Sequence, residues 1–232
     1  MDKLKSLSIG FALLIFLLTG CAKNQQNVSK LSDDKANSLS AQHSKFEKSE
    51  DPPFTAATHF AAGQLAESQE ATASAIAHYQ AALKIESHHQ ASLFRLGILY
   101  TREKAFARAV AVWKQYIKES KDDPTAYANL GFCFELAGHN DVAEKAYQTG
   151  ISRDHNNTAC RVNYGLFLAH AGRTEEAAAQ WRAVLTEAQV HYNLGSIYEQ
   201  QNKRDQAKVE FRQALQHDAN LADAKTRLAA LD

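Results

Sequence analysis

The stretch that decides the fold runs Leu96-Gly-Ile-Leu-Tyr-Thr-Arg-Glu-Lys-Ala-Phe-Ala-Arg-Ala-Val-Ala-Val-Trp113. A glycine, an alanine twelve residues later and an aromatic residue sixteen residues later recur along the chain in this order. The glycine returns every 34 residues, except that the last interval is 30 residues. The five glycines are Gly63, Gly97, Gly131, Gly165 and Gly195. A fixed period of this length indicates five copies of one structural unit.

Each recurring position has a physical reason. The alanines are Ala75, Ala109, Ala143, Ala177 and Ala207, and the aromatic residues are Tyr79, Trp113, Tyr147, Trp181 and Phe211. Because residues four apart share one face of a helix, the alanine and the aromatic residue of a unit point the same way. The glycine on the first helix and the alanine on the second allow the two helices to approach closely. Each unit is therefore predicted to be a pair of packed helices.

A 34-residue helix–turn–helix unit with these residues resembles the tetratricopeptide repeat family. The resemblance covers residues 54–221 and implies an all-α fold, a right-handed superhelical solenoid of five units. Residues 222–232 resemble the capping helix that closes such arrays, because a terminal repeat would otherwise expose its apolar face. The family resemblance also implies that the first helices of the units line a concave groove that binds a protein or peptide.

Local signals predict several helix ends. Asp123 before Pro124 and Thr174 before two glutamates are expected to cap helices at their first residues. Thr186 and Gln189 fit a capping box at the start of the fifth unit. The second helix of the fourth unit, which is the shortened one, is expected to end near Leu185.

The resemblance also assigns residues to the groove, where we expect them to face solvent. Asparagine at the position two before the glycine often bonds the backbone of an extended peptide in family members, although it is also simply common there. Members that grip a C-terminal carboxylate use lysines in the groove, and this chain has none at those positions, so apolar and backbone contacts are expected to hold the partner. The predicted groove residues are Phe60, Phe94, Ile98, Arg102, Asn129, Phe132, Asn163, Leu166, Tyr192 and Asn193.

The N-terminus reads as an export signal. Lys3 and Lys5 precede an apolar run of about 12 residues, which suits a signal peptide and is short for a membrane span. The run ends in Leu18-Thr-Gly-Cys21, which resembles the bacterial lipobox. The resemblance implies that residues 1–20 are removed and that Cys21 carries acyl chains. The alternative is an uncleaved anchor helix with an incidental cysteine.

The residues after the lipobox predict where the protein resides. Ala22 stands where an aspartate would direct retention in the inner membrane, so in a Gram-negative host we expect the outer membrane, facing the periplasm. The lipobox resemblance implies a lipidated cysteine at the start of residues 21–53, and the polar character of the residues after it predicts a flexible tether. The alternative for Leu31 to Phe46 is a short transient helix.

Other function classes receive no support from the sequence. The 26 basic and 26 acidic residues give no net charge, so nucleic-acid binding is not expected. There is no glycine-rich phosphate loop and no nucleophile motif, and the adjacent His88 and His89 cannot face one metal ion from one helix face. We therefore expect no catalysis, no cofactor, no metal and no small-molecule substrate. Cys133 and Cys160 are expected to be buried free thiols.

Two function classes remain open. The first is a membrane-anchored interaction scaffold or assembly adaptor of the cell envelope, because small tetratricopeptide lipoproteins of pilus assembly resemble this chain in size and organisation. Others of this build dock peptidoglycan enzymes. The alternative is a passive structural lipoprotein whose repeats self-associate. The sequence does not name the partner.

Overall fold

The computed structural model describes residues 54–231. This part of the chain consists of helices joined by turns and short irregular segments, and it contains no strand. The signal peptide, the lipidated cysteine and the tether predicted for residues 1–53 lie outside the described residues. The helices are α2 (Ala56–Ser68), α3 (Thr72–Ile85), α4 (Gln90–Arg102), α5 (Phe106–Glu119), α6 (Pro124–Leu136), α7 (Asn140–Arg153), α8 (Thr158–His170), α9 (Thr174–Arg182), α10 (Glu187–Gln200), α11 (Arg204–His217) and α12 (Ala222–Leu231). Within residues 54–231, no helix has the length and apolar character needed to cross a bilayer.

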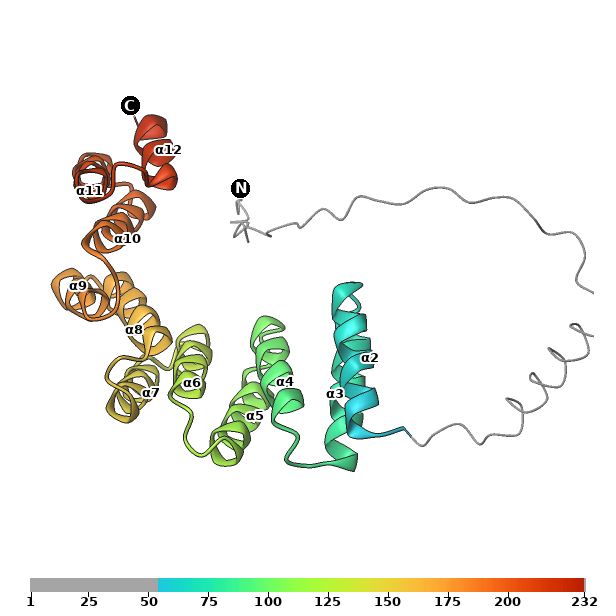
Figure 1. Ribbon diagram of the computed structural model, residues 1–232. Coiled ribbons are helices and arrows are strands. Elements are labelled where there is room, and N and C mark those ends of the chain that lie inside the picture. The colour runs from blue at the N-terminus through green and yellow to red at the C-terminus, as the bar shows by residue number, and fades with distance from the viewer. Residues whose placement is uncertain (1–53, 232) are drawn as a thin grey trace, which may run out of the picture. The chain divides into compact units, whose positions relative to one another are not determined.

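The helices pack in consecutive pairs. The first helices of the five units are α2, α4, α6, α8 and α10, and each packs most extensively on the helix that follows it. α12 packs on α11, at the position expected for the capping helix. Figure 1 shows the pairs following one another along a curve, with the even-numbered helices from α4 onward on its inner side. The prediction of an all-α solenoid of five units is confirmed.

The recurring glycine explains how closely the two helices of a unit approach. A β-carbon on Gly63 would lie 2.5 Å from Cε1 of Tyr79, and one on Gly165 would lie 2.3 Å from Nε1 of Trp181. Both aromatic side chains are completely buried. The alanine twelve residues after each glycine is also completely buried in all five units. The small residues and the aromatic residue therefore form the packing unit that the spacing predicted.

The predicted helix ends are confirmed in two cases and wrong in two. Asp123 accepts a hydrogen bond from the backbone N–H of Thr125, and Thr186 forms its capping box with Gln189. Thr174 is not a cap, because the chain enters α9 through Arg173 and Thr174 is already the first helical residue. α9 ends at Arg182, three residues before the expected end, and a turn then leads into α10.

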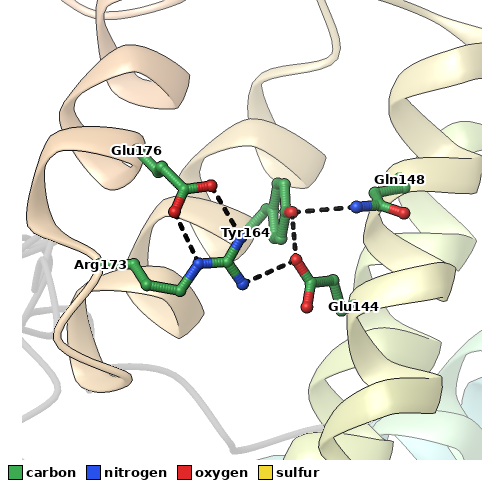
Figure 2. Close-up of polar contacts among 5 residues, drawn as sticks. All are labelled: Glu144, Gln148, Tyr164, Arg173 and Glu176. Atoms are coloured by element: carbon green, nitrogen blue, oxygen red, sulfur yellow. Dashed lines mark hydrogen bonds and ion pairs between the residues drawn. The ribbon is translucent and has the colours of Figure 1, made fainter.

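A polar cluster joins the third unit to the fourth (Figure 2). The Tyr164 hydroxyl on α8 donates to Glu144 on α7 at 2.6 Å and accepts from Gln148 at 3.1 Å. Arg173, in the turn after α8, donates to Glu144 at 2.8 Å and to both oxygens of Glu176 at 2.7 and 2.8 Å. The hydrogen bond from Tyr164, followed by that from Arg173, lowers the pKa of Glu144. The cluster therefore connects neighbouring units by charged hydrogen bonds as well as by apolar packing.

Candidate binding surface

All ten predicted groove residues lie on first helices. The first-helix surface, meaning the surface formed by α2, α4, α6, α8 and α10, carries Phe60 on the first of these and Tyr192 and Asn193 on the last. α4 carries Phe94, Ile98 and Arg102, α6 carries Asn129 and Phe132, and α8 carries Asn163 and Leu166. The arrangement in residues 54–231 thus places these residues in a row along successive units.

Three of the predicted aromatic groove residues are partly buried, which differs from the expectation that they face solvent. Phe60 packs with its ring centroid 5.5 Å from that of Tyr79. Phe94 meets the buried Trp113 edge-on at 5.5 Å, and Tyr192 lies 5.8 Å from Phe211. Each of them covers the recurring aromatic residue of its own unit, so it serves the core as well as the surface.

An open cleft of about 460 Å³ lies between the first two units. Phe60 from α2 and Phe94 from α4 form its apolar wall together with Tyr116 from α5. Gln90, Ala91 and Arg95 complete the lining. Sequence reasoning missed Tyr116, because this residue belongs to a second helix and occupies none of the recurring positions.

Among residues 54–231, three of the four exposed large apolar residues on the first helices lie in the third and fourth units, and the other is Leu65 on α2. Phe132 and Leu136 on α6 are 42% and 48% exposed, and Leu166 on α8 is 36% exposed. α6 and α8 also pack directly against one another, so these side chains lie on two neighbouring first helices. We call Phe132, Leu136 and Leu166 the α6–α8 patch. Exposed apolar surface shared by neighbouring elements is typical of an interaction site.

The polar groove residues differ in their surroundings. Arg102 donates a hydrogen bond of 3.1 Å to the hydroxyl of Thr72 at the start of α3, so its guanidinium is held against its neighbouring unit. Asn129, Asn163 and Asn193 are half-buried and repeat at the same position of three successive first helices. This row of amides shares the first-helix surface with the α6–α8 patch and is suited to bonding a peptide backbone.

Sequence reasoning missed two arginines that bind glutamates of the first-helix surface, one from α4 and one from α12. Arg95 on α4 donates to both carboxylate oxygens of Glu67 on α2, and its Nε lies 2.9 Å from Oε1. Arg227 on α12 donates to Glu199 on α10 at 2.6 Å. In both pairs the arginine follows the glutamate by 28 residues, and this spacing was the available signal.

Glu135 on α6 occupies the same position in its unit as Glu67 and Glu199 in theirs, four residues after the glycine. Its Oε2 accepts a hydrogen bond of 2.9 Å from the hydroxyl of Tyr147, and its Oε1 lies 3.7 Å from Nδ1 of His170. The polar contact with Glu135 raises the pKa of His170. Within residues 54–231, no group of three or more His, Cys, Asp or Glu side chains is placed to hold a metal ion.

Two family models for the tetratricopeptide repeat match the sequence. One matches residues 60–124 and 135–190, and the other matches residues 188–221. The chain belongs to the tetratricopeptide repeat family. Proteins of this family mediate protein–protein interactions, and its repeats are typically scaffolds without catalytic activity. A comparison with curated proteins finds no match.

Solved structures of tetratricopeptide repeat proteins share the fold. YrrB, described as having an unusual peptide-binding site, superposes with a TM-score of 0.50 at 22% identity over 80% of this chain and 96% of YrrB. TTC0263 from Thermus thermophilus superposes with a TM-score of 0.57 at 15% identity over 76% of this chain and 98% of TTC0263. PilW, described as a type IV pilus biogenesis factor, superposes with a TM-score of 0.57 at 15% identity over 73% of this chain and 80% of PilW.

Proposed function

We propose that this tetratricopeptide repeat protein is a membrane-anchored scaffold, an assembly adaptor of the cell envelope that binds a protein partner on its first-helix surface. The observation that carries the proposal is the α6–α8 patch. Its three large apolar side chains are at least 36% exposed, although an interaction-free repeat could place polar residues there at no cost to packing. The partner would be gripped by apolar contacts and by the asparagine row.

The solved structures with a similar fold support partner binding and an assembly role. YrrB is described as having a peptide-binding site, and PilW as a factor in type IV pilus biogenesis. An assembly role in a pilus or another envelope complex agrees with the predicted lipid anchor at Cys21. In this proposal the acyl chains hold the protein at the outer membrane, and the repeats work in the periplasm.

Site-specific crosslinking in cells tests the binding surface. Leu166→p-benzoylphenylalanine places a photo-crosslinker in the α6–α8 patch, and Val142→p-benzoylphenylalanine places one on the second helix α7. Val142 is 46% exposed, so it is a matched control for accessibility. We expect an adduct with a different protein from position 166 and none from position 142. Equal adducts from both positions would contradict the proposal.

The same experiment separates the proposal from its alternative, a passive self-associating lipoprotein. Adducts composed only of two copies of this chain would favour self-association.

The anchor has its own test, in which Cys21→Ser should move the protein from the membrane fraction to the soluble fraction or leave its signal unprocessed. Native protein with residue 1 intact and no acyl chains would refute the lipid anchor.

A further inference from the structure

The arrangement of hydrogen-bonding side chains around Glu67 is repeated two units later around Glu135, except that the arginine is replaced. In the first unit the Tyr79 hydroxyl donates to Oε1 of Glu67 at 2.5 Å, and Arg95 on the next first helix binds both carboxylate oxygens. Burial raises the pKa of Glu67, but the hydrogen bonds from Arg95 and Tyr79 outweigh it and the pKa is lowered. The ionised carboxylate is therefore the form that this arrangement selects.

The third unit has the same tyrosine–glutamate pair, with the tyrosine again twelve residues after the glutamate. Tyr147 donates to Glu135 at 2.9 Å, as Tyr79 does to Glu67. The residue 28 positions after Glu135 is Asn163, which stands where the first unit has an arginine. Among the described residues the one cationic partner recorded for Glu135 is His170, 3.7 Å away and on a side chain that is 52% exposed.

The fifth unit repeats the charge pair at the other end of the array. Arg227 on α12 donates to Glu199 at 2.6 Å, again with a spacing of 28 residues. The chain thus supplies its own arginine to this carboxylate position at both ends of the surface and an asparagine in the middle. The Glu135 side chain is 21% exposed, so part of it is accessible from solvent.

Exposed apolar side chains near Glu135 indicate which residues of a partner could lie beside the group that binds its carboxylate. Phe132 and Leu136 lie three residues before and one residue after it on α6, and Leu166 lies on the neighbouring first helix α8. An apolar rim lowers the local polarity around a charged hydrogen bond and so strengthens it. The site combines one carboxylate, an asparagine and three exposed apolar side chains.

We propose that Glu135 receives an arginine side chain of a protein partner, in the position that Arg95 and Arg227 occupy on Glu67 and Glu199, and that the α6–α8 patch holds apolar residues flanking that arginine. The proposal rests on the proposed function, because it uses the same first-helix surface. It specifies the chemistry of the partner, namely a segment in which arginine stands between large apolar residues. A guanidinium suits the position because its fork matches the two oxygens of a carboxylate, as Arg95 shows on Glu67.

The test uses the isotope-labelled full chain and three acetylated, amidated tripeptides, read by NMR at the backbone amides of α6 and α8. The probes are Leu-Arg-Leu, its neutral isostere Leu-citrulline-Leu, and Ala-Arg-Ala. We expect Leu-Arg-Leu to bind most tightly, and Glu135→Gln to weaken it by about tenfold or more while leaving the citrulline peptide unchanged, since a charge-assisted hydrogen bond contributes about that factor. Equal affinity for the arginine and citrulline peptides would overturn the proposal.

A second variant keeps Glu135 and instead blocks its carboxylate with an arginine from the chain itself. Asn163→Arg gives the third and fourth units the residue that the ends of the array already have, so we expect the fold to be kept. Its guanidinium should occupy Glu135 and reduce binding of Leu-Arg-Leu by about tenfold or more. The matched control is Val142→Arg, which adds the same charge at an exposed position of the second helix α7, away from the first-helix surface, and should leave binding of Leu-Arg-Leu unchanged. Unchanged peptide binding in Asn163→Arg would count against the proposal.

Failure of this inference is distinguishable from failure of the proposed function. If Phe132→Ser weakens the arginine and citrulline peptides equally while Glu135→Gln weakens neither, the apolar surface binds peptides and the role of Glu135 is refuted. If no peptide shifts the amides of α6 and α8, the arginine site is also refuted, whereas the crosslinking experiment at Leu166 still decides the proposed function.

Discussion

A β-carbon placed on Gly97 would lie 2.5 Å from Cε2 of Trp113, closer than real β-carbons come to any such atom. The indole is 1% exposed, and its N–H donates to the hydroxyl of the buried Thr101 at 3.3 Å. The ring is therefore enclosed and has little freedom to move away. The glycine is required by the approach of the second helix and not by its backbone conformation, since it lies inside α4.

Gly97→Ala should therefore destabilise the protein. Alanine favours helix over glycine by about 1 kcal/mol, so the substitution would be stabilising if there were room for it. Overpacking costs about 1–3 kcal/mol, and we expect it to exceed the helix gain. Thermal or urea unfolding measures the net change. In a Trp113→Leu background the same substitution should cost less, and an equal cost in both backgrounds would contradict the packing explanation.

The sequence was sufficient for the fold because its decisive contacts recur at fixed offsets. The glycine, the alanine and the aromatic residue meet within one unit, so their spacing alone predicts two packed helices. Helix ends were less predictable. Thr174 has the residue type of a cap, but the turn that begins at Gly172, with φ near +80°, brings the chain into the helix one residue earlier.

The candidate binding surface was predictable only in part. Family offsets correctly assigned the groove residues to first helices, but they carry no information on what covers each side chain. Phe94 is partly buried because Tyr116, from a second helix, lies 5.5 Å away and closes one side of it. The carboxylate pairs were missed because they join different units, and only the spacing of 28 residues from Glu67 to Arg95 could have indicated one.

Truncation of Phe94 and of Phe132 should have different consequences for stability. Phe94 packs on Trp113 and Tyr116, so Phe94→Ala should lower the free energy of unfolding by about 2 kcal/mol or more. Phe132 is 42% exposed, and Phe132→Ala should stay within about 0.5 kcal/mol. Chemical denaturation of both variants checks this. A large loss with Phe132→Ala would place that residue in the core and remove it from the binding surface.

The titration of His170 should depend on Glu135. The polar contact between them raises the pKa of His170, so Glu135→Gln should bring that pKa back toward its ordinary value. NMR of the imidazole carbons across the neutral pH range measures both variants. An unchanged pKa of His170 in Glu135→Gln would contradict the contact between the two side chains.

The same shift predicts the sign of a stability effect. Because the folded state holds the proton of His170 more tightly than the unfolded state, the contribution to stability is fully present below the unfolded pKa. It is lost as pH rises through the folded pKa. Glu135→Gln should therefore reduce the dependence of the unfolding free energy on pH in the neutral range. An unchanged dependence would show that the ion pair does not form in solution.

The two cysteines of the repeats should resist thiol reagents until the protein unfolds. Cys133 and Cys160 are free and completely buried, as expected from the sequence. The Cys160 thiol donates to the carbonyl oxygen of Pro124 at 3.0 Å, and burial raises its pKa to about 11. Because the thiolate is the reactive form, almost none is present at neutral pH.

A Cys21→Ser chain allows these thiols to be counted without the predicted lipidation site. We expect no reaction with an aromatic disulfide reagent in buffer and release of two thiols per chain in guanidinium chloride.

Cys160→Ser is the informative comparison. Its smaller hydroxyl keeps the hydrogen bond to Pro124 but fills less of the space beside Gly150, where an added β-carbon would lie 2.4 Å from the sulfur. We therefore expect one thiol on unfolding and a modest loss of stability. Rapid labelling of Cys133 in the folded Cys160→Ser variant would show that the junction between the second and third units opens in solution, because Cys133 packs in the core that α6 shares with α4 and α5.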